Sequence, residues 1–332
     1  MRVGVIGAGA VGGAIAALLA RAGHDVEVTA RGDHLGAIRE NGIHLRGGWG
    51  EYVARVHANE LLTRGPELVI VATKAQHAAE ALGDNATFLR GIPILVVQNG
   101  LDGIATASEA APRSDIVGAL ATFASSYLSP GEVTVTATGP TYLGVAADKD
   151  DLPARYVARI LGSVMPVSIV PNFVGAQWTK LVINQVNGLP AVTGRSVQEV
   201  VRDRGLRRVM TASMRETVRT AIRTHIHFEP LQGLGNRGLR LFAALPLWIG
   251  QALPALMARR MGRTPNPGST LQSVRRGQAT EIDYLNGSVV RAASAIGRTA
   301  PVNALIVEMV HEVEKTGDFA TPGAVVERFR AL

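Results

Sequence analysis

The chain has 332 residues, 47% of them hydrophobic, which is enough for a sizeable core and suggests two domains. It contains no cysteine, and this excludes disulfides, thiolate nucleophiles and cysteine–zinc sites. The formal net charge is +7, and residues 202–276 hold fourteen arginines against three acids. Such a block can attract an anionic substrate, nucleic acid or a membrane, but solvated helix faces explain it more simply, so we expect no nucleic-acid partner.

The N-terminus begins with an apolar run, residues 3–6, that leads into a glycine-rich turn and then into small apolar residues. This order predicts a strand, a tight turn and a helix. Gly7 permits the turn, Gly9 lets the backbone approach a pyrophosphate, and Gly12 lets the helix pack closely on the strand. The start of the helix offers N–H groups and a positive dipole end to phosphates. We therefore predict a dinucleotide site, with a ligand-free structural turn as the alternative. Its residues are Gly7, Ala8, Gly9, Ala10, Val11 and Gly12.

No secretory signal precedes the first strand, so we expect a cytoplasmic protein.

A second strand, residues 26–29, ends at Thr29 and is followed by Arg31. Folds that prefer NAD usually place an acid at the end of this strand, where it binds the ribose 2′-OH. The missing acid and the nearby Arg31 favour NADP, whose 2′-phosphate needs a cation. Glu27, in the middle of the strand, is expected to be an ordinary exposed position.

Several further strands are expected in the first half of the chain. Residues 43–45 and 52–56 alternate in polarity and predict a hairpin. Three continuous apolar runs predict buried parallel strands, at residues 67–72, 94–97 and 116–120. These runs end in polar residues, including Lys74 and Asn99, so we expect ligand contacts at the carboxyl edge of the sheet.

The end of this half is expected to close the sheet. Residues 133–136 and 141–144 predict an antiparallel pair, followed by a helix at 153–164 and a strand at 167–170. The fold class is therefore α/β. We predict a Rossmann domain with a doubly wound, mainly parallel sheet over residues 1–171, and an all-α domain for substrate binding and dimerisation, in a homodimer, over residues 172–332.

One apolar segment, residues 241–258, carries no charge over 18 residues, which is near the length of a membrane span. Pro246, Pro254 and the flanking arginines argue against a span. We expect no membrane span here, but a lid, a buried helical hairpin or a subunit interface.

The predicted helix at residues 173–192 carries one of only four lysines in the chain. Gln177, Lys180, Asn184 and Asn187 fall on one face of it, and its other faces are apolar. A helix of this kind is buried, so the polar face should line a cleft, with a face in open water as the alternative. Burial lowers the pKa of a lysine, which suits a general acid for carbonyl reduction, where negative charge grows on oxygen.

A third polar stretch covers residues 277–287. Thr280 and Asp283 have the spacing of a capping box that starts a helix. On the residues alone, Glu281 is most simply a first-turn acid that suits the helix dipole.

Together these motifs resemble the ketopantoate reductase (2-dehydropantoate 2-reductase) family, and the resemblance covers nearly the whole chain. The motifs are the glycine turn, Lys74, Gln98-Asn99-Gly100, Trp178-x-Lys180-x3-Asn184, TEIDYLNG at residues 280–287 and Pro301-Val302-Asn303. The resemblance implies a two-domain reductase with its active site in the cleft between the domains. The implied reaction is NADPH-dependent reduction of 2-dehydropantoate to (R)-pantoate, or of a related 2-oxo acid.

The resemblance also implies roles for individual residues. Lys180 matches the general acid that protonates the C2 oxygen, and Glu281 matches an acid near the ligand hydroxyl and this lysine, which reverses the simpler interpretation of Glu281. The other implied contacts are Asn99 to nicotinamide and substrate, Asn184 and Ser269 to substrate, and Lys74 and Glu281 to the cofactor. No metal site is implied.

Three departures from the family pattern lie on the substrate side. Gly188 replaces a frequent second asparagine, with Asn187 one residue earlier, and Ser273 replaces a common acid. Residues 228–267 form a longer and more apolar stretch, whose role the sequence leaves open. The exact substrate therefore stays open, and the alternatives are a reductase of a different 2-oxo acid or imine and a non-catalytic NADP-binding regulatory protein.

Overall fold

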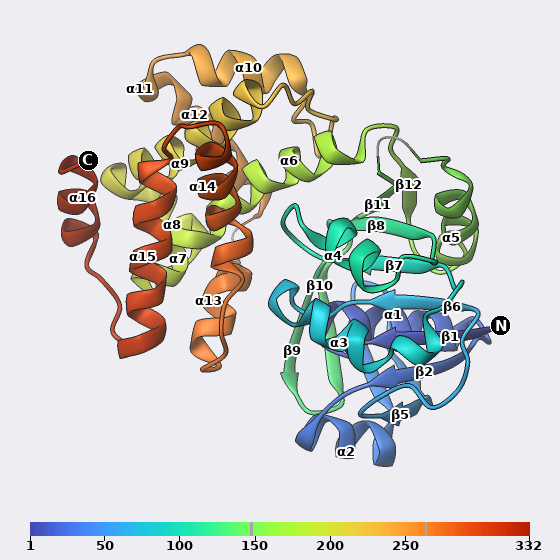
Figure 1. Cartoon of the computed structure of the whole chain (residues 1–332). Coiled ribbons are helices and arrows are strands. Elements are labelled where there is room, and N and C mark those ends of the chain that lie inside the picture. The colour runs from blue at the N-terminus through green and yellow to red at the C-terminus, as the bar shows by residue number, and fades with distance from the viewer. Residues whose placement is uncertain (147–148, 263) are drawn as a thin grey trace. The chain divides into compact units, whose positions relative to one another are not determined.

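In the computed structural model, which describes residues 1–146, 149–262 and 264–332, the chain forms two compact units. The first unit, Met1–Phe173, contains strands and helices, and the second, Val174–Leu332, is helical apart from an isolated bridge between Leu231 and Leu234 (Figure 1). The expected α/β fold followed by a helical region is thereby confirmed.

The main sheet of the first unit has eight strands in the order β12-β11-β8-β7-β6-β1-β2-β5. All neighbours are parallel except β8 and β11. The strands are β1 Arg2–Ile6, β2 Asp25–Thr29, β5 His57–Asn59, β6 Leu68–Val71, β7 Ile94–Val97, β8 Ile116–Ala121, β11 Thr141–Gly144 and β12 Val167–Ile169. The inner strands β6 and β7 are buried at every residue, as expected for parallel strands covered on both faces.

Helices pack on both faces of this sheet. Alternate residues of β1 point to opposite faces, so Val3 and Val5 join a core with α1, and Ile6 joins a core with α3 and α4. The helical elements are α1 Ala10–Arg21, α2 Gly32–Asn41, η1 Ala75–His77, α3 Ala78–Asp84, η2 Ala86–Phe88, α4 Gly103–Ala110 and α5 Leu152–Gly162.

A second, four-stranded sheet has the order β4-β3-β10-β9. Its strands are β3 Ile43–Gly47, β4 Tyr52–Ala54, β9 Ala124–Ser129 and β10 Glu132–Ala137. The expected hairpin of β3 and β4 is confirmed. The expected pairing of residues 133–136 with 141–144 is wrong, because β10 pairs with β9 and β3, and β11 pairs with β8 and β12. The serine-rich β9 gave no apolar signal, and it supplies the partner that β10 uses.

The second unit is built around the long helix α9, which contacts α8, α10, α11, α12, α14, α15 and α16. Its elements are α6 Phe173–Asn184, η3 Gln185–Asn187, α7 Gly188–Thr193, α8 Val197–Arg202, α9 Arg204–Arg223, α10 Asn236–Ala244, α11 Leu247–Gly250, α12 Ala252–Arg260, α13 Gly268–Arg275, η4 Ile282–Tyr284, α14 Asn286–Ala295, α15 Pro301–Thr316 and α16 Pro322–Arg330.

The structure corrects two expectations for this unit and describes one segment whose form the sequence left open. The helix expected at residues 173–192 breaks into a 3-10 turn after Asn184, because Pro190 cannot donate to the carbonyl four residues earlier and clashes with it. The apolar segment 241–258 forms pieces of three short helices, and none of the described helices is long and apolar enough to cross a membrane. The Thr280 hydroxyl accepts from the Ile282 N–H (3.2 Å) at a 3-10 turn, so it does not cap α14.

Candidate active site

The glycine turn between β1 and α1 is fixed by close packing at two of its glycines. Gly7 has φ +96°, and a Cβ there would lie 2.9 Å from the backbone nitrogen of Thr73. A Cβ on Gly12 would lie 2.0 Å from the carbonyl oxygen of Gly7. By contrast, no described atom lies within 4 Å of a Cβ built on Gly9, so space is open beside the turn at this residue.

The start of α1 is suited to an anion. Its N-cap is Gly9, no described side chain caps it, and its first turn holds no acid. The first N–H groups of a helix have no acceptor within the helix, and they lie at the positive end of its dipole. The open space at Gly9 and these donors together fit a phosphate group.

Two residues that the sequence interpretation missed hold this turn in place. The N–H of Gly7 donates to the Thr29 hydroxyl (3.0 Å), and the N–H of Ala8 donates to the Thr29 carbonyl (2.9 Å). His34 Nε2 donates to the Ala8 carbonyl (2.7 Å). Thr29 thus stands where NAD-preferring folds place an acid, and its hydroxyl serves the turn. The polar residues that follow β2, which include His34, are the sequence signal that could have indicated this role.

His34 also links the turn to the second sheet. The N–H of Gly131 donates to His34 Nδ1 (3.0 Å), and the ring packs on Tyr127 with 4.4 Å between centroids. Since Nδ1 accepts and Nε2 donates, both nitrogens are used by the neutral ring. Burial lowers the pKa of His34, while the hydrogen bond to Ala8 acts in the opposite direction. The ring is therefore neutral near pH 7.

The carboxyl edge of the main sheet brings further predicted residues to the glycine turn. The end of β1 pairs with the end of β6, and β6 pairs with β7. Lys74 follows β6 and Asn99 follows β7, and both side chains are half-buried. Gln98 Nε2 donates to the Thr73 carbonyl (3.0 Å) and ties these two strand ends together. Lys74 and Asn99 thus lie along the edge where parallel sheets bind ligands.

Arg31 lies at the end of β2, directly before α2, and its side chain is exposed. Its Nη2 is 3.7 Å from a carboxylate oxygen of Glu80 and 3.7 Å from one of Asp84, both on α3. Exposed ion pairs at such distances contribute little free energy. The guanidinium is therefore held loosely and remains able to bind another anion.

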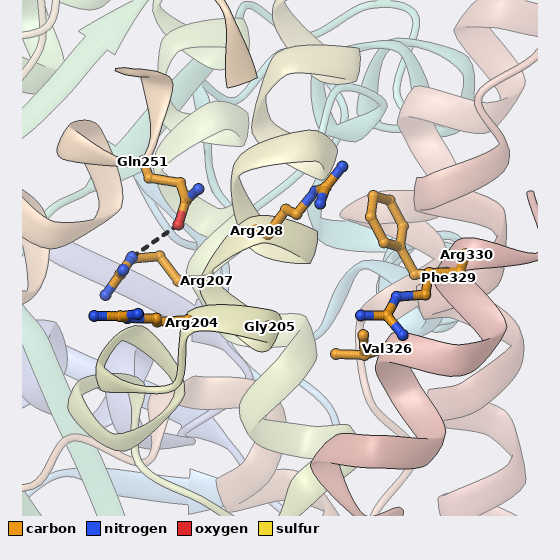
Figure 2. Close-up of a pocket in the computed structure, with 8 residues that line it drawn as sticks. All are labelled: Arg204, Gly205, Arg207, Arg208, Gln251, Val326, Phe329 and Arg330. Carbon is orange, nitrogen blue, oxygen red and sulfur yellow. Dashed lines mark hydrogen bonds between the residues drawn. The ribbon is translucent and has the colours of Figure 1, made fainter. Parts of the chain in front are cut away.

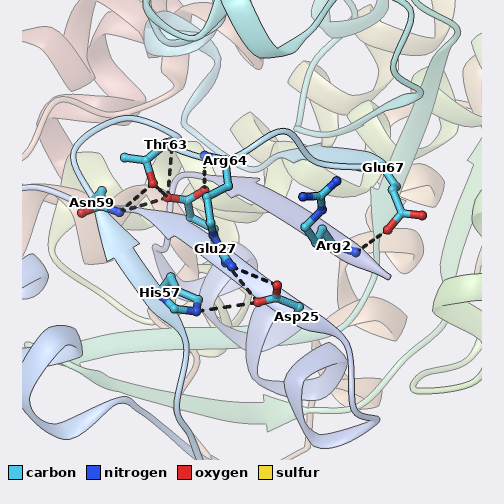
Figure 3. A network of polar contacts seen from close by, with 8 residues as sticks. All are labelled: Arg2, Asp25, Glu27, His57, Asn59, Thr63, Arg64 and Glu67. Atoms are coloured by element: carbon cyan, nitrogen blue, oxygen red, sulfur yellow. Dashed lines mark hydrogen bonds and ion pairs between the residues drawn. The ribbon is translucent and has the colours of Figure 1, made fainter.

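The expectation that Glu27 is exposed is wrong. Its side chain is only 3% exposed, and it accepts hydrogen bonds from the Thr63 hydroxyl (2.6 Å) and Asn59 Nδ2 (3.0 Å) (Figure 3). The backbone N–H groups of Thr63 and Arg64 donate to the same carboxylate. Burial raises the pKa of Glu27, but these hydrogen bonds outweigh it and hold the pKa below its usual value. Glu27 therefore fixes the loop after β5.

Lys180 and Glu281 lie in the second unit and interact electrostatically. Lys180 is on α6, Glu281 directly precedes η4, and both side chains are half-buried. Burial lowers the pKa of Lys180 to about 8, and the charge of Glu281 acts to raise it. The lysine is therefore mostly protonated at pH 7 and still able to release its proton.

The predicted polar face of α6 continues into η3. Gln177 is buried, and Lys180, Asn184 and Asn187 are half-buried, so none of the four stands in open water. The opposite side of the same stretch buries Leu181 and other apolar residues. This polar face is thus partly shielded from solvent.

The packing around η3 explains one departure from the family pattern. A Cβ on Gly188 would lie 2.6 Å from Ile306 Cγ2 of α15, so a larger side chain has no room there. A Cβ on Gly268 would lie 2.6 Å from Asn187 Oδ1, which places Asn187 beside the start of α13. The exposed Ser269 is in the first turn of that helix. Asn187, and not residue 188, therefore lies beside the first turn of α13, which carries Ser269, and Ser273 is buried further along this helix.

A buried polar network, also missed from the sequence, supports the elements that carry Lys180 and Glu281. Asn286 Nδ2 donates to Gln185 Oε1 (2.7 Å) and to Asn303 Oδ1 (3.0 Å), and Asn303 Nδ2 donates to Glu216 Oε2 (2.6 Å). Gln185 is five residues after Lys180, and Asn286 is five residues after Glu281. The network thus joins the two segments. Burial raises the pKa of Glu216, against the hydrogen bonds from Asn303.

A separate recess of about 650 Å³ lies at the start of α9. Figure 2 shows Arg204, Arg207, Arg208 and Arg330 on its lining, with Phe329 and Val326 beside them. The described residues on this lining include none of those predicted for the active site.

Within residues 1–146, 149–262 and 264–332, no group of three metal-ligating side chains could hold a metal ion.

Comparison with protein families gives two matches, one in each half of the chain. Residues 3–148 match the model described as Ketopantoate reductase PanE/ApbA, and residues 172–314 match the model of its C-terminal part. A 2-dehydropantoate 2-reductase of Pyrococcus abyssi (strain GE5 / Orsay) is 26% identical over 92% of this chain and 95% of its own. One from Escherichia coli O157:H7 is 27% identical over 95% of each chain.

Solved structures show the same architecture. A PanE/ApbA family ketopantoate reductase from Ralstonia eutropha JMP134 aligns with a TM-score of 0.79 and 27% identity, over 95% of this chain and 99% of its own. D-mandelate dehydrogenase with NADH and anilino(oxo)acetate aligns with a TM-score of 0.80 over 95% of this chain and 99% of its own. At 19% identity, the second likeness concerns the fold alone.

Proposed function

The chain belongs to the ketopantoate reductase family, and on that premise we propose that it reduces 2-dehydropantoate, or a closely related 2-oxo acid, with NADPH. The product from 2-dehydropantoate is (R)-pantoate. The chain is an oxidoreductase acting on CH–OH groups, and it uses a nicotinamide cofactor. The observation that carries the proposal is a half-buried lysine with a pKa of about 8 beside a carboxylate, Lys180 with Glu281.

The first unit offers groups that fit the cofactor. The open space at Gly9 and the uncapped start of α1 would receive the pyrophosphate, and Arg31 would receive the 2′-phosphate. Lys74 and Asn99, at the same sheet edge, would contact the cofactor, with Asn99 also reaching the substrate. When bound, the nicotinamide cofactor supplies the hydride.

Lys180 would act as general acid. As negative charge develops on the C2 oxygen of the substrate, the ammonium donates its proton to that oxygen. The nearby charge of Glu281 favours the protonated lysine, so the acid is recharged between turnovers. Asn184 and Ser269 would orient the substrate, and Glu281 would also contact its hydroxyl and the cofactor.

A different 2-oxo acid is the second candidate substrate. Ile306 leaves no room at position 188 for the asparagine that the family often has there, and Asn187 lies instead beside the start of α13, near Ser269. A substrate pocket whose amide is displaced by one residue would prefer a 2-oxo acid whose polar group differs in position from that of 2-dehydropantoate.

The proposed enzyme acts in the cytoplasm on a small molecule, as a homodimer.

A substrate panel tests the proposal. The purified chain is given NADPH or NADH with 2-dehydropantoate and with other branched 2-oxo acids, and cofactor oxidation is followed. Binding of each cofactor is measured separately by its fluorescence. We expect 2-dehydropantoate and NADPH to give the highest kcat/KM. Faster turnover of another 2-oxo acid would select the second candidate, and cofactor binding with no turnover of any would overturn both.

A further inference from the structure

Residues 230–280, called here the basic segment, contain all of the excess charge of the chain. They hold seven arginines and no lysine, aspartate or glutamate, and the other 281 residues carry 27 cations and 27 anions. The proposed reaction uses only Ser269 of this segment. A run of 51 residues without an acid creates a local positive field that the proposed reaction does not explain.

Three successive helices of the basic segment each expose a large apolar side chain. Leu241 on α10 is 60% exposed, Trp248 on α11 is 74% exposed and Leu256 on α12 is 46% exposed. Trp248 is the most exposed of the three tryptophans, because Trp49 is half-buried against Phe123 and Trp178 is buried. Large exposed apolar side chains on successive helices are typical of interaction surfaces.

These side chains are not the loose edge of a core, because the opposite faces of the helices are well packed. α10, α11 and α12 all contact α9. Leu239 and Phe242 of α10 and Met257 of α12 are buried. The backbone of Gly250 lies against Phe242, since a Cβ there would be 3.2 Å from its ring. The three helices are thus packed on α9 through their buried residues, while Leu241, Trp248 and Leu256 stay largely exposed.

The arginines among these helices contact neutral groups. Arg240 donates to Asn236 Oδ1 (3.3 Å), and Arg260 donates to the Gln232 carbonyl (3.2 Å). Within the described part of the chain, neither these two nor the exposed Arg237 and Arg259 form an ion pair with an acid. Their charges are therefore available to an external anion.

The positive surface continues onto the start of α9. Arg207 Nε donates to Gln251 Oε1 (3.0 Å), which ties this helix to the basic segment (Figure 2). Arg204 and Arg208 line the recess beside Gln251. The adjoining recess contains Asp203 and Glu327, so the acid-free surface ends at α16.

We propose that α10, α11 and α12 form a peripheral docking surface for anionic lipid bilayers. Tryptophan and leucine side chains enter the boundary between head groups and acyl chains, and arginines bind lipid phosphates. A second copy of the chain fits this face poorly, because a two-fold interface would place each copy's arginines against the other's. The combination of apolar anchors with unopposed cations matches the chemistry of an anionic membrane surface.

Vesicle binding tests this surface with the full-length chain. Vesicles of phosphatidylglycerol and phosphatidylcholine are compared with vesicles of phosphatidylcholine alone, by co-sedimentation and by tryptophan emission. We expect binding only to the anionic vesicles, weakening with salt, and a blue shift that disappears in Trp248→Ser. The double variant Arg240→Gln/Arg259→Gln should bind about 25-fold more weakly, at about fivefold per charge.

A matched pair of exposed arginines in the first unit is the control, Arg90→Gln/Arg113→Gln. This variant should retain nearly full vesicle binding, and an unchanged melting temperature and reductase activity show that all variants are folded. Equal loss in the control variant, or equal binding to both vesicle types, would overturn the proposal. A lipid-free dimer that Trp248→Ser dissociates would assign the face to a second copy and overturn it as well.

Discussion

The anchoring of the glycine turn by His34 leads to a prediction about cofactor binding. The variant His34→Ala removes the hydrogen bond to the Ala8 carbonyl (2.7 Å), the one from the Gly131 N–H (3.0 Å) and the ring contact with Tyr127. Each hydrogen bond contributes about 0.5–1.5 kcal/mol, so the free energy of unfolding should fall by about 1–3 kcal/mol. Thr29 would then be the remaining anchor of the turn.

The same loss should weaken the cofactor. If about 1 kcal/mol is then needed to order the turn on binding, the Kd for NADPH rises about fivefold. Urea unfolding gives the stability change, and cofactor fluorescence gives the Kd. His44→Ala is the matched control, because among the described residues His44 Nε2 forms its hydrogen bond with the carbonyl of Asn41 (3.2 Å), three residues earlier, and not with the turn. Its Kd should equal that of the unsubstituted chain.

Measuring the free energy of unfolding at several pH values separates the contribution of the His34 hydrogen bonds from that of the packing of its ring. The pKa of His34 in the folded chain is below its ordinary value of about 6.5. Its contribution to stability is therefore complete above about pH 6.5 and is lost as the pH falls through the lowered pKa. The difference in stability between the unsubstituted chain and His34→Ala should shrink over that window. Unchanged NADPH affinity in His34→Ala, or a stability difference independent of pH, would show that His34 does not anchor the glycine turn.

Three further predictions follow from the charges and the buried network. The kcat should fall as the pH rises through about 8, because Lys180 must be protonated to donate, and Glu281→Gln should move this fall to lower pH; a flat pH profile would contradict the role. Arg31→Ala should raise the Kd for NADPH about tenfold and leave that for NADH unchanged, and equal effects would remove the argument for the 2′-phosphate. Asn303→Leu should cost about 3 kcal/mol in urea unfolding, because it leaves the buried Glu216 without its side-chain donor, and a loss below about 1 kcal/mol would contradict this.

The parts of the fold that follow from local patterns were predictable from the sequence. The apolar runs of β6 and β7, the hairpin of β3 and β4 and the helix α5 were predicted close to their observed positions. Each carries its own signal, either a continuous apolar run or an alternation. The carboxyl edge of the sheet then follows from parallel topology, and with it the neighbourhood of Lys74 and Asn99.

The misses share a physical cause, since they depend on partners distant in sequence. β9 is rich in serine and is a strand only because β10 pairs with it. Glu27 could be buried only because residues 59–64 supply four hydrogen-bond donors. His34 has no signal of its own, and Ala8 and Gly131 define its role. Local propensity does not encode such pairings.

In the candidate site, too, some residues carry a local sequence signal and others depend on partners distant in the sequence. Helix periodicity singled out Lys180, and the family resemblance alone gave Glu281 a place in the site; the electrostatic interaction of the two residues is consistent with that role. The network of Gln185, Asn286 and Asn303 that holds their segments needs three-dimensional packing to be recognised. The substitution at Gly188 is likewise explained only by Ile306 on α15.

We propose that Lys180 supplies the proton when a 2-oxo acid is reduced. Lys180→Ala, measured with 2-dehydropantoate and NADPH, tests this claim directly. The exposed Lys315 gives the matched control Lys315→Ala, which should leave kcat unchanged. We expect Lys180→Ala to lower kcat by roughly 10²–10⁴ while the Kd for NADPH stays within about twofold. A kcat equal to that of the unsubstituted chain would show that Lys180 is not the general acid.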